Sequence, residues 1–222
     1  MIQINEIFKG ISGEAGTKEF PQGSFCTFVR FQGCNLSCKW CDSERTHDGT
    51  MGRSMNIGSI LTHCATKKVL ITGGEPLFQR LEFIRLCELL IERGHIVQVE
   101  TNGSYMLPEI ADVQWIIDYK LPSSRMMKYM IPIQPLFNYL IDDGGVMVKM
   151  VYETDHDVAY MLDMIQVYRK KVGFSQITAP FIISPTPPAY HKAPDVMKKI
   201  FELKLQEFCI FSLQIHKILG LP

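Results

Sequence analysis

The sequence lacks several features that mark particular classes of protein. Lys and Arg (23) balance Asp and Glu (23), so there is no basic surplus of the kind that nucleic-acid-binding proteins carry. No apolar run reaches the length of a membrane span, and residues 1–6 do not resemble a signal peptide. Internal repeats, low-complexity tracts and linker-like stretches are also missing. The sequence therefore predicts a single domain over residues 1–222, with neither nucleic-acid nor membrane partners.

The composition is that of an ordinary globular protein, with seven cysteines. Hydrophobic residues make up 46% of the chain and charged residues 21%, which suits one sizeable core without a disulfide scaffold. Four cysteines lie in apolar or helical surroundings and are predicted to be buried free thiols: Cys26, Cys64, Cys87 and Cys209. Free thiols fit a reducing compartment, so we expect a cytoplasmic protein.

The other three cysteines form the motif Cys34-x3-Cys38-x2-Cys41. Three thiolates this close in sequence can bind one metal centre, and thiolates favour zinc or iron–sulfur clusters. A structural zinc site usually needs four protein ligands, often as two Cys-x2-Cys pairs, and a second pair is absent from the sequence. The spacing leaves three interpretations open: an iron–sulfur cluster with one iron free of protein ligands, a zinc loop completed by His47, or three unrelated buried cysteines.

Strands alternate with helices along the chain, which implies right-handed crossovers and a parallel sheet. An alternating N-terminal segment is followed by six strand candidates, at residues 24–31, 68–72, 96–101, 113–119, 146–151 and 176–183. This number is too small for an eight-stranded barrel. We therefore predict an α/β fold in which about six mostly parallel strands form an open, partial β/α barrel.

Several chemically distinctive residues come directly after predicted strands: Cys34, Gly73, Asn102 and Lys120. Because the carboxyl ends of parallel strands meet at one edge of a sheet, these residues are expected to line one mouth. The two glycines at 73 and 74 also permit a close approach of the backbone to a ligand.

The cysteine motif, with the aromatic Trp40 before its last cysteine, resembles the signature of the radical S-adenosylmethionine (SAM) enzymes. The resemblance implies a reduced radical SAM core with a [4Fe–4S] cluster on Cys34, Cys38 and Cys41, whose fourth iron binds SAM. It also implies an electron donor such as a flavodoxin or a ferredoxin.

Further motifs resemble one family within that superfamily, the 7-carboxy-7-deazaguanine synthases, over nearly the whole chain. They are EIF…GE from Glu6, FVRFxGCNLSCxWCD from Phe28, TGGEP from Thr72, ETNG from Glu100 and the closing LQIHK…P from Leu213. This resemblance implies a homodimeric lyase that converts 6-carboxy-5,6,7,8-tetrahydropterin with loss of ammonia, on the route to queuosine-type 7-deazapurines.

The family's site roles transfer onto matching positions of this sequence. The implied SAM contacts are Trp40, Asp42, Gly73, Gly74, Glu75, Asn102, Asp118 and Lys120. The implied substrate contacts are Ser12, Gly13, Glu14, Arg30, Thr72, His216 and, through its terminal carboxylate, Pro222. Ser43 stands where the family places a hydroxyl on Mg²⁺, and oxygen ligands suit that cation.

The sequence departs from the family pattern in three places. Ser12 stands where Gln is common, Asp118-Tyr119-Lys120 where Ser-Pro-Lys is common, and residues 184–190 match poorly. Other interpretations are another small radical SAM enzyme such as a glycyl-radical activase, a zinc-stabilised binding module, or a homologue that has lost turnover.

Overall fold

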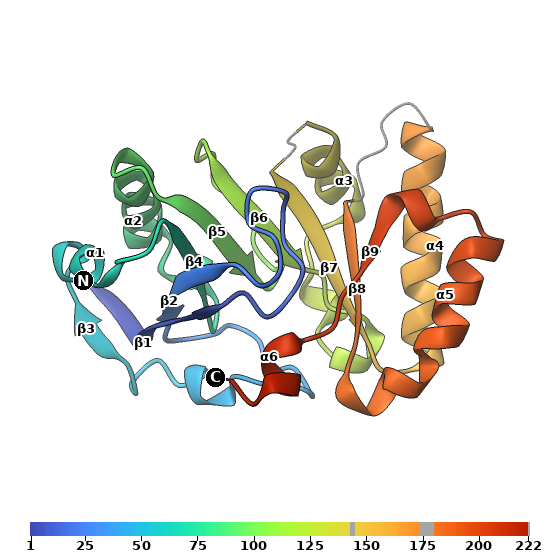
Figure 1. Cartoon of the computed structure of the whole chain (residues 1–222), viewed down its shortest axis with the longest axis horizontal. Coiled ribbons are helices and arrows are strands. Elements are labelled where there is room, and N and C mark those ends of the chain that lie inside the picture. Colours follow the sequence, from blue (N-terminus) through green and yellow to red (C-terminus); the bar gives the residue numbers. More distant parts are fainter. Residues whose placement is uncertain (143–144, 174–179, 222) are drawn as a thin grey trace.

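The computed structural model describes residues 1–142, 145–173 and 180–221, built around one open sheet (Figure 1). Within these residues the sheet has nine strands in the order β3-β1-β2-β4-β5-β6-β7-β8-β9. The strands are β1 (Ile2–Ile11), β2 (Phe25–Phe31), β3 (Arg53–Met55), β4 (Lys68–Gly73), β5 (Ile96–Thr101), β6 (Val113–Asp118), β7 (Val146–Tyr152), β8 (Phe181–Pro185) and β9 (Cys209–Phe211).

The pairing confirms the predicted open and mostly parallel sheet. Every neighbouring pair from β2 to β9 is parallel, while β1 pairs antiparallel with β2 and β3 antiparallel with β1. The expected number of about six strands was too small, because β3 and β9 have three residues each and carry almost no periodic signal. Of the strand expected at 176–183, residues 176–179 lie outside the described part, and β8 begins at Phe181.

Six α-helices are described: α1 (Ile57–His63), α2 (Arg80–Glu92), α3 (Ile133–Asp142), α4 (Asp155–Val172), α5 (Ala193–Glu202) and α6 (Ile215–Leu219). The longest, α4, begins at a capping box in which the Thr154 hydroxyl accepts from the Asp157 N–H and the Asp157 carboxylate accepts from the Thr154 N–H. No helix of the described residues is long and apolar enough to cross a membrane.

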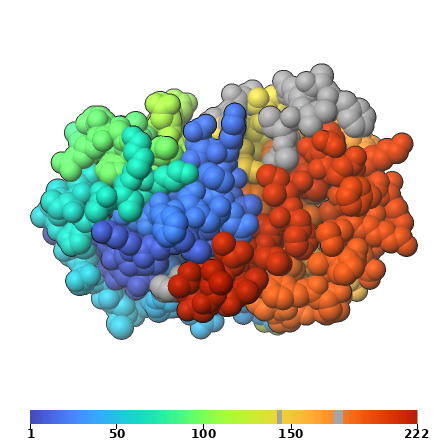
Figure 2. Space-filling view, in the orientation of Figure 1, coloured from blue at the N-terminus to red at the C-terminus, as the bar shows by residue number. Residues whose placement is uncertain are grey.

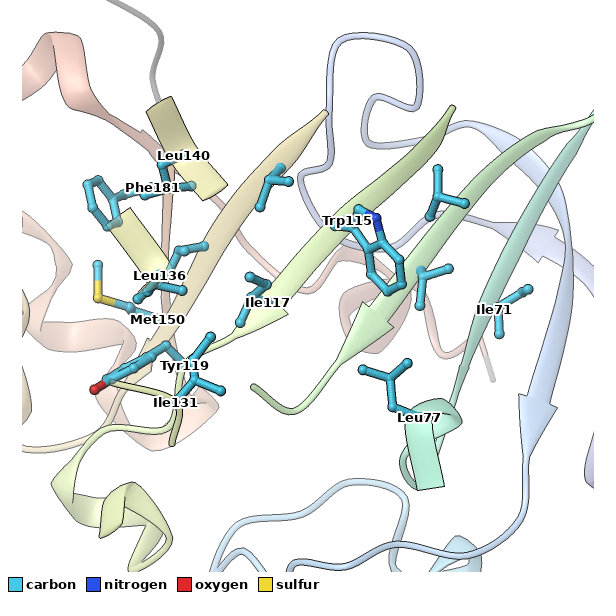
Figure 3. Packing of buried hydrophobic residues seen from close by; sticks show 14 of the residues in the cluster. Ile71, Leu77, Trp115, Ile117, Tyr119, Ile131, Leu136, Leu140, Met150 and Phe181 are labelled. Carbon is cyan, nitrogen blue, oxygen red and sulfur yellow. The ribbon is translucent and has the colours of Figure 1, made fainter. Parts of the chain in front are cut away.

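One face of the sheet, here called the outer face, carries the main hydrophobic core. Val29, Ile71, Val99 and Trp115 are buried there, and their register places them side by side across β2, β4, β5 and β6. Figure 3 shows Ile71 and Trp115 of this layer on the same side of the sheet as Leu136 of α3 and Leu77 of the short 3₁₀ helix η2 (Pro76–Gln79). Side chains at every second position of a strand point to the same face, so these apolar residues pack beneath the helices.

The opposite, inner face is partly covered by two segments from the ends of the chain. We call residues 12–22 and 212–216 together the wall. The Gln22 side-chain amide joins its two parts, donating to the Gly13 carbonyl at 3.0 Å and to the Leu213 carbonyl at 2.7 Å. Figure 2 shows the red C-terminal residues packed against the blue N-terminal ones on one face of the molecule.

Candidate active site

A cavity of about 500 Å³ opens between the inner face, the wall and the loop that carries the three cysteines. Most of the predicted site residues line it: Gly13, Glu14, Arg30, Cys34, Cys38, Trp40, Cys41, Asp42, Ser43, Thr72, Gly73, Gly74, Asn102, Asp118, Lys120 and His216. Ser12 and Glu75 are buried beside the cavity without lining it. Pro222 lies outside the described residues.

Two glycines at the end of β4 hold that strand directly against the cysteine loop. Gly73 has φ +135°, and a Cβ there would lie 2.3 Å from the Phe31 carbonyl oxygen. A Cβ on Gly74 would lie 2.2 Å from the Gly33 carbonyl oxygen and 3.0 Å from Cys34 Cβ. Only glycine fits at either position, because the backbone segments that frame the cysteines come this close. The expected approach of these glycines to a ligand stays a prediction.

The three cysteines of the loop are free thiols facing the same cavity. Burial raises the pKa of Cys38 to about 11 and also raises the pKa of Cys34 and of Cys41, so without a metal all three stay protonated at neutral pH. The Leu36 N–H already points at Cys34 Sγ, at 3.4 Å.

These thiols suit a cluster better than a single ion. Three cysteines supply one ligand fewer than a structural zinc site usually takes from the protein. In a [4Fe–4S] cluster each thiolate binds a different iron, so the sulfurs need not converge on one point. Three cysteines in one loop, facing one cavity, therefore fit such a cluster.

The loop is anchored through its aromatic residue. The Trp40 indole N–H donates to the Ser123 hydroxyl at 3.1 Å, in the 3₁₀ helix η3 (Pro122–Ser124). The Lys120 ammonium lies 5.2 Å from the centroid of the Trp40 ring and pairs with Asp118 at 3.0 Å. Two of the predicted SAM contacts, Lys120 and Trp40, thus touch each other at the end of β6.

Glu75 takes a different position from its two glycine neighbours. Its carboxylate is fully buried and accepts from the Leu77 N–H at 2.8 Å, the Thr101 hydroxyl at 2.9 Å and the Asn102 N–H at 2.7 Å. Burial raises the pKa of Glu75 to about 7. In this arrangement Glu75 caps η2 and fixes the end of β5, where Asn102 enters the cavity. A direct contact of Glu75 with SAM stays a prediction.

Polar side chains cross the inner face from strand to strand, and we call them the polar row: Glu6, Arg30, Thr72, Glu100, Asp118 and Lys149. Glu6 pairs in register with Arg30, and Arg30 with Thr72. The Thr72 hydroxyl donates to Glu100 at 2.9 Å, which extends the row to β5. Glu6, Glu100 and Lys149 were given no role from the sequence. For Lys149 the available signal was a charged residue within the otherwise apolar run of β7.

Lys149 is the positive centre of the row. Its ammonium pairs with Glu14 of the wall and lies 3.5 Å from Asp118. Burial opposes its charge, but Glu14, Asp118 and Glu100 together raise the pKa of Lys149, so it remains a cation. The pKa of Glu100 rises to about 7 because of burial, with the Glu14 charge adding to the rise. Lys149 is therefore a buried cation held between Glu14 and Asp118 on the inner face.

At the other end of the row, two arginines share one acid. Glu6 Oε1 accepts from Arg30 Nε at 2.8 Å and from Arg45 Nη2 at 2.6 Å. Arg30 Nη1 also donates to the Ser43 hydroxyl at 3.3 Å, and that hydroxyl donates to Asp42 at 3.0 Å. The structure therefore brings Arg30 together with the Asp42-Ser43 pair that follows the cysteines.

The three departures from the family pattern each have a structural place. Ser12 lies within the wall, where its N–H donates to the Ser24 carbonyl at 2.8 Å. The Tyr119 N–H donates to the Lys149 carbonyl at 2.8 Å, a bond that a proline could not make. In the third tract, Thr186, Pro187 and Pro188 line the cavity.

Known proteins are similar to this chain over much or nearly all of its length. The model of the radical SAM superfamily matches residues 28–116. A 7-carboxy-7-deazaguanine synthase from Methanospirillum hungatei JF-1 is 32% identical over 227 residues, covering 100% of this chain and 86% of the relative. One from Clostridium acetobutylicum is 29% identical over 233 residues, covering 99% and 96%. The crystal structure of QueE from Escherichia coli superposes with a TM-score of 0.67 at 20% identity, covering 96% and 93%, which shows a shared fold.

Proposed function

The chain belongs to the 7-carboxy-7-deazaguanine synthase family of radical SAM enzymes, and from this premise we propose how its residues divide the work of the reaction. The reaction converts 6-carboxy-5,6,7,8-tetrahydropterin to 7-carboxy-7-deazaguanine with loss of ammonia. The observation that carries the proposal is that the cysteine loop and the polar row face the same cavity.

The mouth of the cavity is proposed to hold the cofactors. Cys34, Cys38 and Cys41 hold the cluster, and SAM lies against those residues assigned to it in the sequence that line the cavity: Trp40, Asp42, Gly73, Gly74, Asn102, Asp118 and Lys120. When bound, the cluster and SAM supply a carbon-centred radical that removes a hydrogen atom from the substrate. The protein's own contribution is to orient these groups and to keep water away.

The polar row and the wall are proposed to hold the substrate. Arg30 is suited to the carboxylate of the pterin, because its guanidinium can form two parallel hydrogen bonds. Thr72 and Glu14 offer hydroxyl and carboxylate oxygens to the ring N–H groups, and Lys149 keeps Glu14 in place. Burial lowers the pKa of His216, so its imidazole enters the site neutral and can accept as well as donate one hydrogen bond.

A magnesium ion is proposed at Ser43. Its hydroxyl and the neighbouring Asp42 carboxylate both line the cavity, and they offer the oxygen ligands that Mg²⁺ prefers. Arg30 touches the same hydroxyl, so a cation at Ser43 would adjoin the substrate carboxylate. The organisation as one domain, the homodimer, the reducing cytoplasmic location and a flavodoxin or ferredoxin as electron donor are parts of the same proposal.

The test is an anaerobic turnover assay with reconstituted protein. Incubation with SAM, Mg²⁺, a reductant and the carboxytetrahydropterin is expected to give the deazaguanine product without net consumption of SAM. An activase-like enzyme would instead cleave SAM without the pterin. Colourless protein that contains zinc and no iron, or iron-loaded protein that leaves the pterin unchanged, would contradict the proposal.

A further inference from the structure

His47 contacts one of the three loop cysteines. Its Nε2 lies 3.2 Å from Cys41 Sγ, and its side chain lines the cavity. From the sequence His47 was weighed as the fourth ligand of a zinc ion. The three thiols that share the cavity fit an iron–sulfur cluster, and beside a cluster the same contact gives the imidazole a different role.

The turn that carries His47 is held in place from within the protein. The buried Gln32 side-chain amide donates to the Arg45 carbonyl at 3.0 Å and to the Asp48 carbonyl, one residue on from His47. The Thr46 carbonyl, one residue before His47, accepts from the Gly33 N–H at 2.7 Å. These bonds fix the backbone on both sides of His47, and Gly33 directly precedes the first cysteine. The imidazole is therefore positioned by the same framework as the cysteine loop.

We propose that His47 donates a hydrogen bond from Nε2–H to the Cys41 thiolate and thereby raises the reduction potential of the cluster. A metal-bound thiolate offers lone pairs and no proton, so the imidazole must be the donor in this pair. Reduction adds one negative charge to the cluster, and a donor at a cluster sulfur stabilises the reduced state more than the oxidised one. His47 is thus a positioning residue that tunes the cluster.

The inference rests on the proposed function only for the presence of the cluster. It is tested on the full chain, reconstituted anaerobically, with the variants His47→Leu and His47→Gln. Leucine removes the donor, whereas the glutamine amide can restore it. The matched control is His63→Leu, which removes an exposed imidazole on α1 whose ring contacts the Ser59 carbonyl. Iron and sulfide content is measured first, and then the midpoint potential by a redox titration followed by electron paramagnetic resonance.

The midpoint potential is expected to become more negative in His47→Leu, to stay close to the wild-type value in His47→Gln, and to be unchanged in His63→Leu. If His47→Leu loses the cluster, His47→Ala takes its place as the variant without a donor, and its potential is again expected to be more negative than that of His47→Gln. Equal potentials in all four proteins would overturn it. So would loss of the cluster from both His47 variants, or a strong ¹⁵N coupling in wild-type protein labelled with ¹⁵N-histidine, because either marks His47 as an iron ligand. Wild-type protein without iron would instead refute the proposed function.

Discussion

The two faces of the sheet use neighbouring residues of the same strands for opposite purposes. Ile71 and Ile117 point to the outer face and are fully buried in the main core, while Thr72 and Asp118, one residue further, line the cavity. On β7, Val148 is buried in the same core and Lys149 carries the charge of the polar row. Neighbouring residues of one strand therefore point to opposite faces, one into the hydrophobic core and the other into the cavity.

The comparison teaches that the two faces tolerate change in different ways. The outer face needs only apolar side chains of the right volume, so substitutions there act on the free energy of unfolding. The inner face holds charges that are kept in place by partners on other segments, as Lys149 is by Glu14 and Asp118. Substitutions there are expected to act on cofactor or substrate binding, or on the pH dependence of stability where a buried ionisable group is removed, and four variants test this division.

The largest effect is expected for Cys38→Ala. Removing one of three thiolates should abolish both the cluster and turnover, while the melting temperature of the metal-free protein changes little, because Cys38 is only partly buried. Iron content, turnover and a thermal melt measure the three quantities. Cys209→Ala is the control. Cys209 lies outside the cavity, so this variant should keep its full iron content. Full iron content in Cys38→Ala would refute its assignment as a ligand.

Ile117→Ala should lower the stability of the protein and leave its turnover unchanged. Ile117 is fully buried beneath the helices, and removing three carbons should lower the free energy of unfolding by about 2–5 kcal/mol. Turnover per iron-loaded molecule should stay near the wild-type value. Urea denaturation and an activity normalised to iron content measure the two effects, and Ile117→Val should give a much smaller loss. Loss of turnover at unchanged stability would break the division between the faces.

Much of the fold could be predicted because its signals are local. Buried strands such as β4 and β7 are short apolar runs, which local patterns reveal. Residues 122–138 could not be assigned, because prolines and methionines obscure the start of α3 at Ile133. The edge strand β3 is defined by its pairing with β1, a contact that no local pattern reports.

The site residues that could be predicted are those that belong to recognisable sequence motifs. The cysteines and the two glycines are recognisable by spacing, whereas the role of Lys149 depends on Glu14, a residue far away in sequence. Glu75 illustrates the same limit: its motif was recognised, but its three hydrogen-bond donors come partly from β5 and the residue after it. Electrostatic partners on other strands are set by the register of the sheet, and the sequence does not display that register.

Glu100→Gln should change how stability depends on pH. Below the ordinary pKa of 4.5 both the folded and the unfolded state keep this proton. Between 4.5 and about 7 the unfolded state releases it and the folded state retains it, so the free energy of unfolding of the wild type falls as the pH rises through this window.

The glutamine side chain does not ionise, so the free energy of unfolding of Glu100→Gln does not fall in this way as the pH rises. It should be more stable than the wild type by about 1–2 kcal/mol at pH 8, and the difference should become small near pH 5. This is less than the full shift implies, because Glu100 lines an open cavity where solvent screens its charge. Urea denaturation at the two pH values measures it, with Ile117→Val as an outer-face control whose effect does not depend on pH. A constant difference would show that Glu100 ionises normally.

Gly13→Ala should give the smallest effect and probes the wall alone. A Cβ at this position would lie 2.0 Å from His216 Nδ1, so the imidazole must move away from its place in the cavity. The KM for the pterin is expected to rise about fivefold, or about 1 kcal/mol, with little change in stability. Gly58→Ala on α1 is the control, because a Cβ there meets only the Asn56 side chain, at 3.4 Å. If His216 carries the effect, Gly13→Ala should add nothing to His216→Ala; independent, additive losses would show that the glycine acts through another part of the wall.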